Sequence, residues 1–497
     1  MGVAKSQFVV TTRLLFLLLI FSSFVKLFHI GYRSFFLDEL YGVVAGLEKS
    51  SSIFFEEWVN YDNSPPLYYI LLRLWLQVVP ADETGARSLS TIFVILASFI
   101  FVNGVRKRFK SDIWIYLGLL VSCNYAFLYF AQEARAYALL LLITCCQLLY
   151  FIDLITISEA AKGRKALVFF SIFSVLSAYT HYSGAFFTAI LFSFLFYDSR
   201  NNWKYLKSKL IALAACLLVG IPWLPYFVVN MGVEKFQVSY SLSGLVKMFI
   251  PMLCFGNTGV GKALCLLFLL LIAYLLFRKR NSFSSKNKLE MNLFILTAIS
   301  CLIVLLFPFF TPMRTYRHYI VFVPLILLSF SFLIATSKFE FNKILLIVGG
   351  LFILGWQMQS HYKSPREEWR QAVEYLVEKN ENTNAVAIVL GEPWIKSSKE
   401  YLIQDGEWTY MKIRRPLFYN YYLKRFDPRG NIKLIVLSPN SPEIERYIAD
   451  ALKNSSKIFL LSYTGDLPYG MGSFELSTNF RYTKKAFMGH EVFCITN

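Results

Sequence analysis

The chain has 497 residues, of which 56% are hydrophobic and only 16% are charged, and its formal net charge is +18. Because soluble domains carry about a quarter charged residues, this composition indicates a polytopic membrane protein rather than a soluble enzyme. The eight cysteines form no Cys-x-x-Cys or Cys-x-x-His pair, so we expect neither a disulfide scaffold nor a thiolate metal cluster.

Apolar runs long enough to cross a bilayer, which takes about 20 residues, follow one another through residues 1–358. The segment 65–79, PPLYYILLRLWLQVV, is shorter, contains Arg73 and begins with two prolines, so we interpret it as an interfacial or re-entrant helix. This leaves residues 30–87 as one large loop. We predict about eleven spans, at 9–29, 88–105, 112–131, 136–157, 166–181, 183–198, 210–229, 263–277, 290–310, 318–336 and 343–358.

Lysines and arginines gather in alternate loops between these spans. Positive residues near span ends stay on the cytoplasmic side of a membrane. The basic loops, at 106–110, 162–165, 200–209, 278–288 and 338–343, are therefore predicted to be cytoplasmic, and residues 30–87 extracytoplasmic. We attribute the net charge to topology and to contacts with anionic membrane lipids, and expect no nucleic-acid partner.

The composition changes at residue 359. SPREEWRQAVEYLVEKN is typical of an amphipathic helix capped by Ser364, with Pro365 at its first position. AVAIVL (385–390), IKLIVL (432–437) and KIFLLSY (457–463) are predicted strands, separated by the predicted helices LFYNYYLKRF and SPEIERYIADALKNS. We therefore predict a mainly α fold class: a transmembrane catalytic domain, 1–358, and a small α/β domain, 359–497, on the outer face. No nucleotide-binding fingerprint occurs, and we expect this domain to provide support or to recognise the acceptor.

Each predicted outer loop carries more polar residues than a simple turn needs. The first has the acidic pair Asp38–Glu39 in RSFFLDELYG, followed by YDNSPPLYY with its candidate residues Asp62, Asn63, Pro65 and Pro66. The later loops carry Gln132, Glu133 and Arg135 in QEARAYAL, His181 in YTHYSG, and Arg314, Arg317, His318 and Tyr319 in TPMRTYRHYIVFVP.

Each residue alone has an ordinary explanation. An acidic pair can cap a helix, and arginines at a membrane edge can reach lipid headgroups. The functional hypothesis depends on their convergence on one membrane face. Carboxylates can deprotonate a hydroxyl or hold a divalent metal, and arginines suit a phosphate. The set predicts transfer from a lipid-linked phosphate to a hydroxyl.

In this order, the segments FLDE, YDNSPPLYY, ARSLS, QEARAYAL, THYSG and YRHYIVFVP resemble the GT-C membrane glycosyltransferases. The resemblance covers about residues 9–360 and is strongest to the bacterial branch related to protein O-mannosyltransferases and the lipid A aminoarabinose transferase. It implies a polyprenyl-phosphate sugar donor and inverting transfer to a lipid, glycan or protein acceptor. It also implies a multi-pass protein of the bacterial cytoplasmic membrane with an extracytoplasmic C-terminal domain.

The resemblance also implies roles for individual residues. Asp38 is expected to be the general base, with Glu39 positioning it, or both as ligands of a divalent metal such as Mg²⁺ or Mn²⁺. Residues expected to hold the donor phosphate are Arg135, His181 and Arg317, with Tyr319 nearby and Arg314 as the alternative to Arg317, because His318 interrupts the usual Arg-Tyr pair. Asp62, Asn63, Pro65 and Pro66 are expected to support the loop, although Asn63 and Ser64 stand where relatives often carry His or Lys.

Two other classes of function stay open. A flippase or transporter of lipid-linked saccharides could line a passage with the same residues, but it should show internal repeats and charges within its spans, and neither is evident. A glycan ligase or polymerase also uses outer arginines, but it relies on large late loops and needs no early acidic pair.

Overall fold

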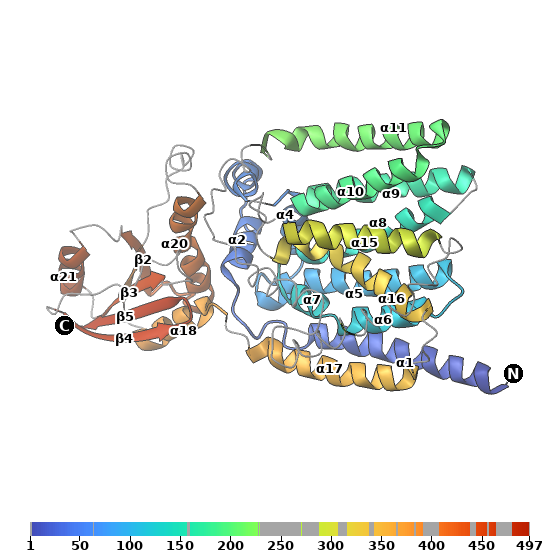
Figure 1. Ribbon diagram of the computed structural model, residues 1–497. Helices are drawn as coiled ribbons and strands as arrows, with labels where there is room; N and C mark the ends of the chain where they lie inside the picture. The colour runs from blue at the N-terminus through green and yellow to red at the C-terminus, as the bar shows by residue number, and fades with distance from the viewer. Residues whose placement is uncertain are drawn as a thin grey trace.

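The computed structural model describes residues 2–62, 64–156, 160–226, 228, 270, 288–306, 316–336, 342–363, 366–381, 384–390, 407–437, 444–454, 457–463 and 480–496. Within these residues a bundle of roughly parallel and antiparallel helices carries a smaller domain with a sheet at one end (Figure 1). The helix α2, Leu37–Gly46, lies between the bundle and that domain.

Six helical segments among the described residues are long and apolar enough to cross a membrane, and the chain is a multi-pass membrane protein. They lie in α1 (Gly2–Leu27), α5 (Glu83–Arg108), α8 (Tyr137–Thr156), α11 (Trp203–Gly220) with η4 (Ile221–Trp223), η7 (Tyr316–Phe322) with α16 (Val323–Thr336), and α17 (Lys343–Lys363).

A seventh span is formed if Ile113–Cys123 (α6) and Tyr125–Gln132 (α7, Tyr125–Tyr129, with η3, Phe130–Gln132) count as one segment bent by 53°. The bend falls at Asn124, whose side chain accepts a hydrogen bond from the N–H of Ala126 and so caps a new helix. These seven segments correspond to seven of the predicted spans.

Three further predicted spans form helices: α9 (Ala160–Thr180), α10 (Tyr182–Ser199) and α15 (Lys288–Leu306). Apart from Leu270, the predicted span 263–277 lies outside the described residues. Polar contacts join the helices inside the bundle. The side-chain NH2 group of Gln147 in α8 donates to Ser174 in α9 and to Thr188 in α10, each at 2.9 Å, so one buried amide nitrogen links three helices.

The first loop, residues 28–82, is built from short helices: α2, α3 (Ser51–Ile53), the π-helix η1 (Phe54–Trp58), η2 (Val59–Tyr61) and α4 (Leu67–Trp75). At 1.5 Å per residue, the nine residues of α4 span only about 14 Å, which is too short to cross a hydrocarbon core of about 30 Å. This length agrees with the predicted interfacial or re-entrant helix. Gly42 of α2 faces Leu72 and Tyr69 of α4, so the two helices pack closely.

The C-terminal domain contains α18 (Trp369–Asn380), β1 (Ala385–Leu390), α20 (Glu407–Phe426), β2 (Ile432–Leu437), α21 (Ile444–Asn454), β3 (Lys457–Tyr463), β4 (Arg481–Phe487) and β5 (His490–Thr496). The sheet order is β2-β1-β3-β5-β4, with β1 parallel to β2 and β3, and β5 antiparallel to β3 and β4. The strands β1, β2 and β3 are those predicted from the sequence, whereas the β4–β5 hairpin was not predicted.

The start of α18 differs from the prediction. Ser364 and Pro365 lie outside the described residues, but residues 366–368 are not helical, and the helix begins at Trp369. The N–H of Glu368 donates to the carbonyl of Met488 at 3.0 Å, and the N–H of Met488 donates back to the Glu368 carboxylate at 2.9 Å. These contacts with the β4–β5 turn hold Glu368, the residue directly before the helix.

Candidate functional site

The acidic pair lies at the start of α2, and its two carboxylates face different surroundings. Phe36 is the N-cap residue, and its N–H donates to the carboxylate of Glu39 at 2.9 Å, which is the return half of a capping box. The Asp38 side chain remains 35% exposed, whereas that of Glu39 is fully buried. Local helix geometry therefore gives the two adjacent carboxylates different roles.

Glu39 is the centre of a buried ionic network. Its carboxylate receives Nε of Arg87 at 2.8 Å, Nη2 of Arg87 at 2.9 Å, Nη2 of Arg366 at 2.9 Å and the N–H of Ala134 at 2.9 Å. Burial opposes its ionisation, but the guanidinium groups of Arg366 and Arg87 outweigh burial and lower the pKa of Glu39 to about 2. Since its oxygens are occupied by these donors, we assign Glu39 to positioning rather than to proton transfer.

Arg87 completes this network by holding the chain just before α2. Its remaining N–H groups donate to the carbonyls of Ile30, Arg33 and Ser34 at 2.8–2.9 Å. The guanidinium is planar with five donors in a fixed arrangement, so one side chain can fix a carboxylate and three carbonyls together. The segment that leads to Asp38 is thereby tied to the beginning of α5.

Arg317 is the residue that joins the acidic pair to a later loop. Its Nη1 lies 2.9 Å from Oδ2 of Asp38 and 3.5 Å from Oε1 of Glu133, and its guanidinium carbon lies 4.9 Å from the centre of the Phe36 ring. The Arg317 side chain is 18% exposed. A carboxylate and a guanidinium thus meet at a partly open position, 279 residues apart in the sequence.

Glu133 lies beneath this pair. Its side chain is buried, and neither carboxylate oxygen has a hydrogen-bond partner among the described residues. Burial raises the pKa of Glu133 above its ordinary value, although the charges of Arg317 and Arg366 oppose the shift. Its contact with Arg317 is an ion pair at a distance too long for a good hydrogen bond.

Arg135 organises the second half of the first loop. It donates to the hydroxyl of Tyr69 at 2.7 Å and to the carbonyl of Asp38 at 3.3 Å, and it lies 3.5 Å from the carboxylate of Asp62. The Tyr69 hydroxyl in turn donates to Asp62 at 2.5 Å. Asp62 and Arg135 therefore belong to one hydrogen-bonded cluster. Pro65 and Pro66 are buried directly before α4, and Pro66 is the N-cap residue of that helix.

The rings of His181 and His318 contact each other at a tilt of 36°. The ring of His181 lies 5.4 Å from that of His318 and 5.5 Å from that of Tyr137, and its Nδ1 accepts the N–H of Ser183 at 3.1 Å, which caps α10. Burial, aided by His318 and Arg135, lowers the pKa of His181 well below its ordinary value. A neutral ring can offer a hydrogen bond but adds no positive charge.

The remaining candidates are placed as follows. Tyr319 is only 2% exposed and belongs to the apolar core of the bundle. Arg314 and Asn63 lie outside the described residues. The structure thus brings together Asp38, Glu39, Asp62, Arg135, His181 and Arg317 at one end of the bundle.

A metal site does not fit this arrangement. Within the described ranges, no group of three or more His, Cys, Asp or Glu side chains is arranged to hold a metal ion. The Glu39 oxygens already accept hydrogen bonds from two arginines and two backbone N–H groups. Glu39 therefore does not present the open oxygen ligands that Mg²⁺ or Mn²⁺ would require beside Asp38, and we derive no step through a metal.

Four residues of the site were assigned no role from the sequence: Arg87, Arg366, Tyr69 and Glu133, of which only Glu133 stood among the polar residues singled out in the predicted outer loops. Glu133 stands in the same turn as Arg135, and a carboxylate at a predicted membrane edge is a usable signal. Arg87 and Arg366 are 48 and 327 residues from Glu39, so no local pattern indicates their contact with it.

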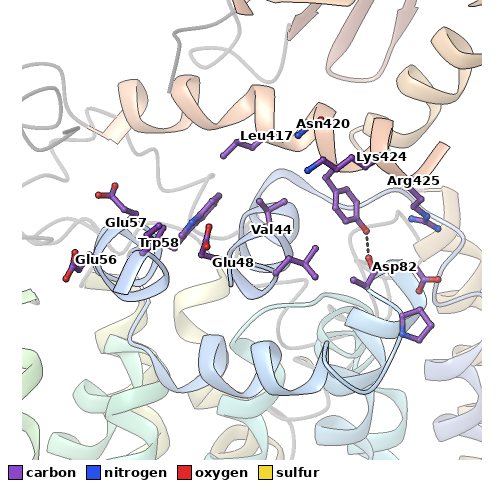
Figure 2. A pocket seen from close by; sticks show the side chains of 15 residues that line it. Val44, Glu48, Glu56, Glu57, Trp58, Asp82, Leu417, Asn420, Lys424 and Arg425 are labelled. Carbon is purple, nitrogen blue, oxygen red and sulfur yellow. Dashed lines mark hydrogen bonds between the residues drawn. The ribbon is translucent and has the colours of Figure 1, made fainter. Parts of the chain in front are cut away.

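A cavity of about 970 Å³ lies between the first loop and α20 (Figure 2). One side is lined by Val44 of α2, by Glu48 just after that helix, by Glu56 and Glu57 from η1, and by Asp82, and the other by Asn420, Lys424 and Arg425. At about 100° per residue, Val44 lies about 240° around α2 from Asp38, and Leu47 and Glu48 follow the end of that helix. Asp38 does not line the cavity, so the cavity is not the position at which that carboxylate would act.

No protein-family model matches this chain, and no curated protein matches its sequence. Two crystal structures of ArnT from Cupriavidus metallidurans are similar in fold. The first, in the apo state, has a TM-score of 0.59 and 11% sequence identity, over 99% of this chain and 98% of that one. The second, bound to undecaprenyl phosphate, has a TM-score of 0.58 and 11% identity, over 96% and 97%. Over nearly its whole length the chain thus shares the fold of these two ArnT structures.

Proposed function

We propose that the chain is an integral-membrane glycosyltransferase, which moves a sugar from a polyprenyl-phosphate donor to a hydroxyl of a lipid, glycan or protein acceptor. The observation that carries the proposal is the pair Asp38–Arg317, in which a carboxylate and a guanidinium meet at 2.9 Å in a partly exposed position. The fold shared with ArnT, one structure of which contains undecaprenyl phosphate, supports a donor of this class.

In the proposed reaction, the Asp38 carboxylate takes the proton of the acceptor hydroxyl. The hydroxyl oxygen attacks the anomeric carbon from the side opposite the phosphate, so the configuration inverts. The bond from the anomeric carbon to the phosphate oxygen breaks, and its electron pair leaves with the polyprenyl phosphate. The phosphate gains negative charge as it leaves, which a guanidinium stabilises through charge-assisted hydrogen bonds.

Arg317 is suited to this second task. It lies between Asp38 and Glu133, so two anions hold it in the site before a donor arrives. We propose that the donor phosphate takes over part of the contact with Asp38, which leaves that carboxylate available for the acceptor proton. Arg135 and His181 then help to hold the donor phosphate, and Arg135 does so while it also fixes Tyr69 and Asp62.

The proposed setting is the outer side of a bacterial cytoplasmic membrane. The site and the C-terminal domain lie toward the same end of the bundle (Figure 1). The basic residues Arg106, Lys107 and Arg108 lie in the last turn of α5, whereas Arg87 of the site lies near its start, about 30 Å of helix away. With basic ends on the cytoplasmic side, the site and the C-terminal domain would be extracytoplasmic.

The test is transfer in proteoliposomes with a panel of radiolabelled polyprenyl-phosphate sugars, offered with lipid, glycan and peptide acceptors. We expect label to move from at least one donor to an acceptor hydroxyl. A separate assay follows movement of the labelled donor between leaflets. Lipid movement without transfer would favour the transporter hypothesis, and the absence of transfer from every donor would contradict the proposal.

A further inference from the structure

Residues 366–370, which we call the strap, comprise the three residues before α18 and its first two residues, and they contact the segment that carries Asp38. Nη2 of Arg366 lies 2.9 Å from Oε2 of Glu39. The carboxylate of Glu367 accepts the N–H of Leu37 at 3.0 Å. The N–H of Arg370 donates to the hydroxyl of Ser34 at 3.1 Å, and its guanidinium donates to the carbonyl of Gly31 at 3.0 Å.

The other side of the strap is anchored in the C-terminal domain. Trp369 is completely buried, and its ring centre lies 4.3 Å from that of His490 in β5 and 4.9 Å from that of Tyr419 in α20. Its indole N–H donates to the Glu367 carboxylate at 2.7 Å. One carboxylate therefore links the core of the sheet domain to the N–H of Leu37.

These contacts fall on both neighbours of Asp38. Leu37 is the first residue of α2, and its N–H has no acceptor within the helix. The Glu367 carboxylate fills this place and also suits the positive end of the helix dipole. Glu39, on the other side of Asp38, is held by Arg366. The backbone that carries Asp38 is thus held at residues 37 and 39 by side chains from about 330 positions later in the chain.

We propose that the strap positions Asp38 for transfer, with Glu367 and Arg366 as positioning residues, so that the C-terminal domain is a working part of the transferase centre. This proposal rests on the proposed function of Asp38. Neither residue touches the substrate in this proposal. Each acts by holding the start of α2 in place. A displacement of about 1 Å of a reacting group can lower a rate about a hundredfold, so loss of these contacts is expected to slow transfer.

The test compares Glu367→Ala, Glu367→Gln and the control Glu378→Gln in the reconstituted full chain. Glu378 is exposed on α18, in the same domain. We expect Glu367→Ala to lower kcat at least tenfold with donor KM changed less than twofold. Glu367→Gln keeps an oxygen that accepts the N–H groups of Leu37 and Trp369, so we expect it to keep at least half of kcat, and the control to match wild type. Unchanged kcat in Glu367→Ala would overturn the proposal.

A second measurement does not depend on transfer. Asp38→Cys is labelled with a water-soluble maleimide, alone and together with Glu367→Ala or Glu378→Gln, and label on the native cysteines is subtracted using the unsubstituted chain. We expect Glu367→Ala, but not the control, to raise the labelling rate at position 38 severalfold. Equal rates in all three backgrounds would show that the strap does not hold this position, whatever reaction the protein catalyses. Wild type without transfer, but with the expected labelling, would instead refute the proposed function alone.

Discussion

The substitution Glu39→Gln tests the buried network with little change of shape. It removes the negative charge that faces Arg87 and Arg366 and keeps one acceptor oxygen, whereas the N–H groups of Phe36 and Ala134 donate to different oxygens of Glu39 in the wild type. The two arginines stay buried, with side-chain exposures of 1% and 9% in the wild type. We expect a folded but less stable protein, because buried cations would lose their compensating charge.

Two independent estimates give the size of this effect. Removing one partner of a buried ion pair costs about 3–5 kcal/mol in measured cases. The pKa of Glu39 falls from 4.5 to about 2 on folding, and at about 1.4 kcal/mol per pKa unit this corresponds to about 3–4 kcal/mol. We therefore expect a loss of about 3–4 kcal/mol at neutral pH, which lowers the melting temperature by several degrees.

The assay is thermal unfolding in detergent across pH. Because the folded state depresses the pKa of Glu39, its stabilisation is fully present above pH 4.5 and is lost as the pH falls from 4.5 toward 2. Glu39→Gln should lack this part of the pH dependence. Asp450→Asn, at an exposed ion pair with Lys453, is the control and should leave the melting temperature unchanged. A Glu39→Gln protein as stable as wild type at neutral pH would refute the reasoning.

Three further substitutions test the site around this network. Arg317→Lys keeps the charge but cannot bridge Asp38 and Glu133 through a planar guanidinium, and we expect at least a tenfold fall in kcat in the transfer assay. Glu133→Gln removes a carboxylate whose pKa is raised by burial. A group with a raised pKa makes the folded state less stable as the pH rises above the pKa of the unfolded state. The melting temperature of the variant should therefore fall less between pH 5 and pH 7 than that of wild type. Tyr69→Phe removes the hydroxyl shared by Asp62 and Arg135. We expect the free energy of unfolding to fall by about 1–3 kcal/mol and the donor KM to rise. An unchanged donor KM would show that Arg135 does not support donor binding.

Much of the architecture follows from patterns that are local in the sequence. Spans are recognisable from apolar length, and β1, β2 and β3 from short apolar runs between capped helices. The meeting of Asp38 with Arg317 was also predictable in outline, because both stand at span ends that the loop charges assign to one membrane face. Packing of the helices into one bundle then brings the two side chains to 2.9 Å.

The division of work between Asp38 and Glu39 could not be predicted in the same way. An Asp-Glu pair does not indicate which carboxylate faces inward; that depends on where α2 begins and on the long-range contacts of Arg87 and Arg366. The β4–β5 hairpin was missed for a different reason. RYTKKAF is almost entirely exposed in β4 and shows no alternation of apolar and polar residues, so it lacks the usual sign of a strand.

The most direct test of the proposed reaction is the transfer rate of Asp38→Asn beside that of wild type, in vesicles that contain a donor on which wild type is active. Asparagine keeps the shape and can still accept a hydrogen bond from Arg317, but it cannot take the proton of a hydroxyl. We predict a fall in kcat of at least a hundredfold, within the range that general-base catalysis supplies, with donor binding retained. Full transfer activity in Asp38→Asn would contradict the assignment of Asp38 as the base.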